Sequence, residues 1–307
     1  MDFFVQQLVN GLTLGSLYAL LALGYSIVYG VLGLLNFAQG EVYMVGAFIG
    51  FGVLSGLGGP TALVMPVPFA LLLMFTAAAL GSGVLSVTIE RVAFKPLRDS
   101  SRIAPLITAL GVSVFLQNAV LLLLGPDIRN YDASSFIPFT SGIHAGPLNV
   151  SLIRIIVIVT TVAVMIALTL WVGRSKLGRS MRAVSYDREA AQMIGVDVDR
   201  TIMIAFFVGG VLAGIAGVMA GLVFSRVFQL MGFVAGLKAF TGAVIGGIGS
   251  IPGAVLGGFL IGLTEAFATG YLPGGSVYAN LYVFALLIGM FLIRPSGLLG
   301  SPVIQKV

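Results

Sequence analysis

Long apolar runs are the feature of this sequence that most limits its fold. Several stretches of about 18 or more residues carry hardly a charge, and a helix of that length crosses roughly 30 Å of hydrocarbon. Backbone groups in lipid must pair within the chain, and continuous apolar runs favour helices over the alternating segments of a barrel. The sequence therefore predicts an all-α, polytopic helical membrane protein, with one transmembrane domain over residues 1–307.

Glycine content supports this prediction. The chain is 58% hydrophobic and only 9% charged, and 42 of its 307 residues are glycine, about twice the usual share. Because lipid provides no hydrophobic drive between helices, small residues that allow close backbone approach hold such bundles together. We therefore expect the helices to be closely packed.

The apolar runs predict eight or nine membrane segments. Two loops rich in Lys and Arg, at about 91–102 and 174–201, belong in the cytoplasm by the positive-inside rule, as do Arg294 and Lys306. The connection over about 125–152 has few basic residues and belongs outside. The expected spans are 6–30, 40–58, 62–89, 104–125, 153–173, 202–224, 233–249, 253–270 and 277–293.

A glycine- and proline-rich break, GGIGSIPG, divides the apolar sequence near the C-terminus. If two crossings meet at this break, the chain has nine segments and its N-terminus lies outside, which is the interpretation that we favour. If the segment 233–249 is re-entrant, the count is eight and the N-terminus lies inside.

Several kinds of chemistry are missing from the sequence. It has no cysteine, a single histidine (His144) and no phosphate-binding loop, since none of its four lysines follows a glycine. These features argue against an enzyme and against a metal or nucleotide bound by this chain. The net charge of +5 is explained by membrane orientation, so we expect no nucleic-acid partner.

Glu41, Lys238 and Glu265 fall within predicted spans, where an unpaired charge costs at least about 2.5 kcal/mol. We expect Glu41 and Lys238 to lie near the membrane interface and extend towards water. Glu265 is expected either in a water-filled path or at the headgroups. An ion-gradient-driven carrier would depend on Glu265, but such carriers usually place several carboxylates along the bundle.

Polar uncharged side chains provide further candidates. Asn36 and Gln39 precede the second span, and Gln117 lies within the fourth. Hydrogen bonds between helices are one interpretation of these residues. The other is a path for a polar substrate, lined by Asn36, Gln39, Glu41 and Glu265.

The segment SYDREAAQMIGVDVDR, residues 185–200, is unusually polar for this chain. Asp187 is suited to cap a helix, Glu189 would follow in its first turn, and Gly195 would end it. The pattern predicts a short helix over 188–194.

This predicted helix has an apolar face formed by Ala190, Met193 and Ile194. Two turns of helix are not stable alone in water, so this face must rest on another surface. That surface is either the underside of the protein and the membrane interface, or a cytoplasmic partner.

Glu189-Ala190-Ala191, followed by Gly195, resembles the EAA-x-x-x-G core of the cytoplasmic loop of ABC importer permeases. Over nearly its full length the chain resembles the branched-chain amino acid permease family, in particular the H-type subunit of the high-affinity Liv system. The closing PSGLLG and four longer segments carry this resemblance: 10–44, 89–98, 111–118 and 238–258.

The resemblance implies a permease subunit of an ABC importer in the bacterial inner membrane, moving branched-chain or related amino acids from periplasm to cytoplasm. The implied partners are a second related permease, two cytoplasmic ATPase subunits that bind the ATP, and a periplasmic substrate-binding protein, with membrane lipid around the bundle. The implied ATPase contacts are Arg188, Glu189, Ala190, Ala191 and Gly195. The substrate among amino acids, amides and urea stays open at this point, as do the choice of homodimer or heterodimer and the roles of Arg226 and Lys238.

Overall fold

The computed structural model describes residues 2–59, 65–98, 100–101, 103–131, 142–145, 148–294 and 296–300, so Arg102 and Lys306 lie outside the described residues. The α-helices among them are α1 (Asp2–Leu32), α2 (Gln39–Gly56), α3 (Val67–Ile89), α4 (Ile103–Leu124), α5 (Leu152–Arg174), α6 (Lys176–Tyr186), α7 (Arg188–Met193), α8 (Val198–Phe224), α9 (Met231–Gly246), α10 (Ile251–Tyr271) and α11 (Gly275–Ile293). A π-helical turn, η1 (Glu90–Phe94), and a 3-10 turn, η2 (Lys95–Leu97), extend α3. The predicted all-α, polytopic class is confirmed.

Seven of the described helices are long and apolar enough to cross a membrane: α1, α3 with its extension, α4, α5, α8, α10 and α11. Helix α2 has 18 residues, and α9 has 16, about 24 Å at 1.5 Å per residue. Both are short because their first turns begin inside the bundle, where Gly40 of α2 lies directly against Gly232 of α9.

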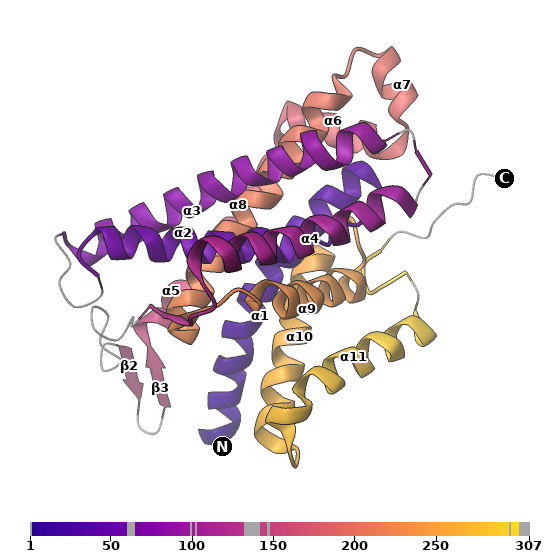
Figure 1. Ribbon diagram of the computed structural model, residues 1–307. Helices are drawn as coiled ribbons and strands as arrows, with labels where there is room; N and C mark the ends of the chain where they lie inside the picture. The colour runs from indigo at the N-terminus through magenta and orange to yellow at the C-terminus, as the bar shows by residue number, and fades with distance from the viewer. Residues whose placement is uncertain are drawn as a thin grey trace.

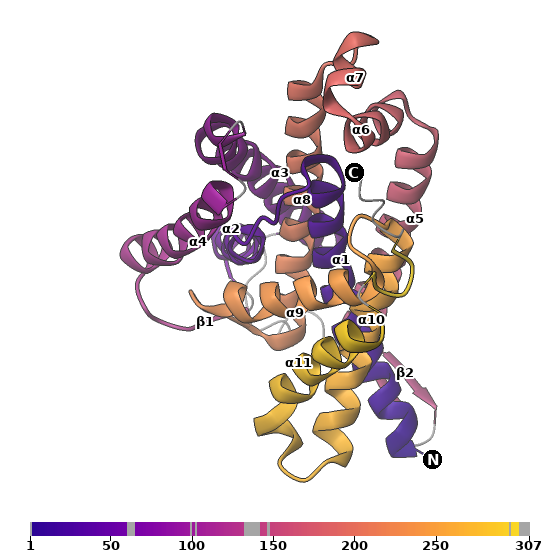
Figure 2. The same ribbon diagram turned by 90° about the vertical axis from the view of Figure 1, so that its right-hand side faces the viewer.

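Helices α1 and α8 form the centre of the bundle. Most of their apolar residues are buried, whereas α4, α5 and α11 are largely exposed. Helices α2, α3 and α4 lie on one side of α8, and α9, α10 and α11 form a second group (Figures 1 and 2). The outer helices present large side chains such as Leu122, Leu123 and Ile293, as a lipid-facing surface requires.

The helix directions decide how the chain passes the glycine-proline break. Helices α1 and α10 run antiparallel, with Gly11 against Leu263 and Gly15 against Phe259, and α9 also runs antiparallel to α10. Gly249, in the break, lies beside Gly30 near the inner end of α1. Helices α9 and α10 therefore form an antiparallel pair that is joined at the break, and the N-terminus lies at the end opposite α6 and α7 (Figure 1). Because α9 begins inside the bundle and is not one of the seven candidate spans, the predicted count of eight or nine segments is only approximate.

Glycines make these close approaches possible, as the composition predicted. A Cβ atom on Gly262 would overlap the backbone nitrogen of Gly15, and one on Gly258 would overlap the backbone of Ala19. Only glycine allows α1 and α10 to approach this closely, and the resulting backbone contact substitutes for the hydrophobic drive that lipid does not provide.

Short strands, which the sequence did not predict, lie at the outer end. Strand β1 (Arg129–Asn130) pairs with β4 (Arg226–Val227), and β2 (Gly142–Ala145) forms a hairpin with β3 (Leu148–Ser151). Next to β1, the buried Tyr131 donates a hydrogen bond of 2.8 Å to the carbonyl oxygen of Ala47. Burial raises the pKa of the Tyr131 hydroxyl well above its ordinary value. This residue anchors the outer loop to α2.

Candidate coupling site and buried polar groups

The polar segment predicted from the sequence forms helix α7, and local hydrogen bonds define both of its ends. The Asp187 carboxylate accepts hydrogen bonds from the backbone N–H groups of Glu189, at 3.0 Å, and Ala190, at 3.1 Å. The α7 helix ends at Met193, and Gly195 has a φ of +83°, the left-handed conformation that favours glycine. The predicted N-cap and terminating glycine are thus both present, with the helix one residue shorter than expected.

The apolar side chains of α7 point away from the protein. Met193 is 88% exposed and Ile194 is 76% exposed, whereas Ala191 is only 2% exposed. Ala191 faces the protein, and the Arg188 guanidinium donates a hydrogen bond to the carbonyl oxygen of Leu32 at the end of α1. The interpretation that the apolar face rests on the protein's own underside is therefore wrong, because Ala191 and Arg188 hold the helix against the protein instead. The membrane interface and a cytoplasmic partner stay open as surfaces for this face.

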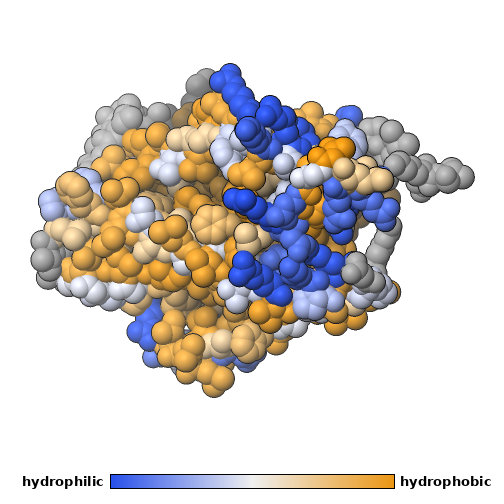
Figure 3. Space-filling model, turned by 90° about the horizontal axis from the view of Figure 1, so that it is seen from above, coloured by the Kyte–Doolittle hydropathy of each residue, from blue (hydrophilic) through white to orange (hydrophobic). Residues whose placement is uncertain are grey.

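Hydrophilic residues gather on this end of the molecule. Seen from above, they cover the right-hand part of the face, on the side where α6 and α7 lie, and most of the remaining visible surface is hydrophobic (Figure 3). Exposed Glu189 and Ala190 belong to α7, and Tyr186 at the end of α6 is 88% exposed. An apolar cluster on a polar face is typical of a contact surface for another protein or for a membrane.

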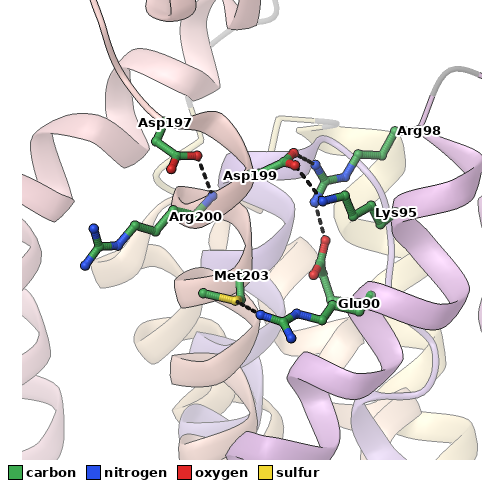
Figure 4. Close-up of polar contacts among 8 residues, drawn as sticks. Glu90, Lys95, Arg98, Asp197, Asp199, Arg200 and Met203 are labelled. Atoms are coloured by element: carbon green, nitrogen blue, oxygen red, sulfur yellow. Dashed lines mark hydrogen bonds and ion pairs between the residues drawn. The ribbon is translucent and has the colours of Figure 1, made fainter.

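An ionic clamp, formed by Glu90, Lys95, Arg98 and Asp199, joins α8 to the inner end of α3 (Figure 4). The Asp199 carboxylate contacts Lys95 Nζ at 2.7 Å and also pairs with Arg98, which in turn pairs with Glu90. Because Asp199 lies in the first turn of α8, only a few residues after α7, the clamp ties the segment that follows α7 to the inner end of α3.

Reasoning from the sequence missed this clamp. Lys95 and Arg98 were interpreted only as cytoplasmic charges that orient the chain, and the partner Asp199 lies 101 residues after Arg98. The one available signal was the presence of Glu90 and Asp199, two carboxylates at the edges of basic loops. That signal indicates ion pairs without saying which residues form them.

The candidate path residues near α2 are buried and mostly bonded to neighbouring helices. Gln39 Nε2 donates to the carbonyl oxygen of Gly209 in α8 at 2.8 Å, and Asn36 Oδ1 accepts from the backbone N–H of Ala38 at 3.1 Å. Glu41 Oε1 accepts from Gln117 Nε2 of α4 at 2.7 Å. The hydrogen bonds between helices predicted for Gln39 and Gln117 are confirmed.

Glu41 does not extend to the membrane interface, contrary to our expectation, because it is fully buried. The prediction was wrong because α2 begins inside the bundle, so its first turn is not at an interface. Three buried polar atoms in this region have no partner among the described residues: Asn36 Nδ2, Gln39 Oε1 and Glu41 Oε2. Such groups are expected where a polar solute or water passes.

Lys238 and Glu265 form a buried ion pair. Lys238 Nζ lies 2.6 Å from Glu265 Oε1, and the Tyr18 hydroxyl donates a hydrogen bond of 2.8 Å to Glu265 Oε2. Lys238 is 6% exposed, so the expectation that it reaches the membrane interface is wrong. The ion pair, together with the hydrogen bond from the Tyr18 hydroxyl, offsets the free-energy cost of burying the two charges. Arg226, by contrast, is exposed in β4 at the outer end.

A bundle with several membrane-crossing helices, polar groups buried along its interior and an exposed helix at one end has the architecture of a membrane transport subunit. Residues 7–293 match the family model described as the permease component of the branched-chain amino acid transport system. The chain belongs to this family. It is accordingly a multi-pass membrane protein and a transport permease component, not an enzyme.

Similar proteins cover almost the same length. The chain is 42% identical to the high-affinity branched-chain amino acid transport system permease protein BraD of Pseudomonas aeruginosa, over 99% of this chain and 98% of the relative. It is 38% identical to the corresponding permease protein LivH of Escherichia coli, with the same coverage. It is also 32% identical, over 33% of each chain, to the D-allose transport system permease protein AlsC of Escherichia coli.

Proposed function

We propose that this chain is the membrane-spanning subunit of an ATP-driven importer in a bacterial inner membrane, moving branched-chain or related amino acids from periplasm to cytoplasm. The observation that carries this proposal is the exposed apolar surface of α7, Met193 and Ile194, on a helix whose two ends are defined by Asp187 and Gly195. The names of the full-length relatives support the substrate class.

In this proposal α7 is the contact for a separate cytoplasmic ATPase. A short rigid helix with a small exposed residue, Ala190, and exposed apolar side chains fits a groove of a partner. Movement of α7 would pass through Asp197, which caps α8, to the clamp at Asp199. Helices α8 and α3 would then move together and change access to the interior.

The proposed assembly contains a second related permease, two ATPase subunits and a periplasmic substrate-binding protein. ATP binds to the ATPase subunits, and this chain carries no cofactor of its own. The substrate path would include the polar groups of Asn36, Gln39, Glu41 and Glu265. A gradient-driven carrier that depends on Glu265 receives less support, because that carboxylate is already paired with Lys238.

The test is a pull-down of the tagged full-length chain from its native membrane in mild detergent, with an assay for ATP binding in the co-purified fraction. We expect an ATP-binding subunit with the unaltered chain and its loss in Glu189→Arg, because reversing this exposed charge disturbs the contact surface. Asp127→Arg, the same change at an exposed position of the outer end, is the matched control and should retain the subunit.

Two results would contradict the proposal. An ATP-binding subunit that stays bound in Glu189→Arg would remove α7 from the contact surface. No ATP-binding subunit with the unaltered chain, together with amino-acid uptake driven by an ion gradient, would favour a secondary carrier instead.

A further inference from the structure

A cavity of about 480 Å³ with both polar and apolar lining lies at the outer end of the bundle, opposite α6 and α7. Residues of α1, α5, α8, α10 and α11 line it, so it is formed by helices that are far apart in the sequence. Its polar lining includes Gln7, Asn10, Thr13, Arg154, Glu265 and Thr269. The cavity therefore contains both a guanidinium and a carboxylate.

Arg154 is the third residue of α5, and its charge has no carboxylate partner among the described residues. Its Nη1 donates a hydrogen bond of 2.5 Å to Asn10 Oδ1, a neutral acceptor. A guanidinium has five N–H donors, so this bond leaves most of them available. A partly buried cation without an anion is costly, and an anionic ligand group would remove that cost.

The Glu265 backbone lies beside the part of α1 that Arg154 contacts. Gly11 of α1 packs against Leu263 and Ala266 of α10, so the Glu265 backbone is level with Asn10, the residue that Arg154 contacts. Each oxygen of the Glu265 carboxylate accepts one hydrogen bond, from Lys238 or from Tyr18. A carboxylate has about four acceptor positions, so it is able to accept a further donor.

The charges of this region do not balance. Lys238 and Glu265 compensate each other, which leaves the positive charge of Arg154 without a counter-charge among the described lining residues. A ligand that fits this arrangement needs a negative group for Arg154 and a donor for Glu265. Beside these polar groups the lining is aliphatic or aromatic, with Leu14, Val223 and Phe224.

We propose that this cavity binds a free aliphatic amino acid, with its α-carboxylate on Arg154, its α-ammonium on Glu265, and its side chain against Leu14, Val223 and Phe224. This inference rests on the proposed function and assigns an outer binding site for its substrate. A lipid phosphate would also suit the guanidinium, but a phosphate group offers no N–H donor to the Glu265 carboxylate. The test separates these two ligands.

The experiment measures binding of radiolabelled L-leucine and of leucinamide to the full-length chain in nanodiscs, purified with its co-purifying subunits. We expect leucine to bind more tightly than leucinamide, which lacks the carboxylate. In Arg154→Gln leucine affinity should fall about tenfold or more, and the preference over leucinamide should vanish, because a charge-assisted hydrogen bond is lost. Arg129→Gln, at another arginine of the outer end, is the matched control and should bind leucine normally.

Three outcomes overturn the inference. These are unchanged leucine affinity in Arg154→Gln, equal affinity of the unaltered chain for leucine and leucinamide, and a co-purified phospholipid that disappears in Arg154→Gln while leucine binding persists. If Arg154→Gln does not fold, Arg154→Lys is the second variant. It keeps the positive charge but cannot make bidentate hydrogen bonds to a carboxylate, so it should show a smaller loss of leucine affinity.

Failure of this inference is distinguishable from failure of the proposed function. The pull-down of an ATP-binding subunit depends on α7, at the opposite end, and Arg154→Gln should leave it intact. If the subunit co-purifies while the unaltered chain binds no leucine, the cavity assignment is wrong and the ATP-driven permease stands. If no ATP-binding subunit co-purifies in any variant, the proposed function itself is wrong.

Discussion

The bundle interior and helix α7 differ in the kind of side chain that each buries and exposes. In the interior the charges of Lys238 and Glu265 meet within 2.6 Å, and glycines bring helices into backbone contact. On α7 the apolar side chains of Met193 and Ile194 are exposed, and Asp187 and Gly195 define the helix ends. The interior is arranged for stability in lipid, whereas α7 is arranged for contact. Substitutions in the two regions should therefore change different properties.

The largest expected effect is on the interior ion pair. Glu265→Gln would leave Lys238 buried without an anion, and breaking a buried pair lowers the free energy of unfolding by about 3–5 kcal/mol. Unfolding in mixed detergent micelles measures this loss. The double variant Lys238→Met/Glu265→Leu removes both charges and should recover most of the stability. A double variant as unstable as the single one would show that the charges are needed for more than mutual compensation.

A smaller effect is expected at the contact between α2 and α9. A Cβ atom on Gly40 would overlap the carbonyl oxygen of Gly232, so Gly40→Ala should destabilise the bundle by about 1–3 kcal/mol. Gly52→Ala is the matched control in the same helix, because no atom lies within 4 Å of its Cβ position. This control should stabilise the protein by roughly 0.5–1 kcal/mol through helix propensity. Equal effects at the two positions would contradict close backbone contact.

The smallest effect on stability is expected on α7. Because Met193 and Ile194 are exposed, the double variant Met193→Ser/Ile194→Ser should change the free energy of unfolding by no more than about 0.5 kcal/mol. The same variant should lose the ATP-binding subunit in the pull-down. A large loss of stability would show that these side chains pack on the protein, and would remove the contrast between the two regions.

Much of the fold was predictable, because lipid imposes simple rules. Each predicted span corresponds to a helix, and seven of these helices are long and apolar enough to cross the hydrocarbon. The run 202–224 lies within α8, which begins at Val198. Asp187 and Gly195 were predicted as the ends of α7 because capping depends on residues only a few positions apart.

The predictions that failed share one cause. Glu41 and Lys238 were expected at the interface because each apolar run was assumed to cross the membrane from one surface to the other. Helices α2 and α9 begin inside the bundle instead, so position along the run did not indicate depth. The cavity at Arg154 and the clamp at Asp199 were missed for a related reason, since each joins helices that are distant in sequence.

The sequence by itself determined the all-α multi-pass class, the permease family and the short capped helix. These depend on hydrocarbon thickness, on local hydrogen bonds and on motifs that are continuous in the chain. Only the tertiary structure decided that Glu265 pairs with Lys238 and with Tyr18, which is 247 residues away, and that Met193 and Ile194 are exposed. The physical reason is that lipid provides no hydrophobic drive for helix association. Which helices pack together therefore depends on close glycine contacts between segments far apart in the chain, and this packing determines which polar groups meet.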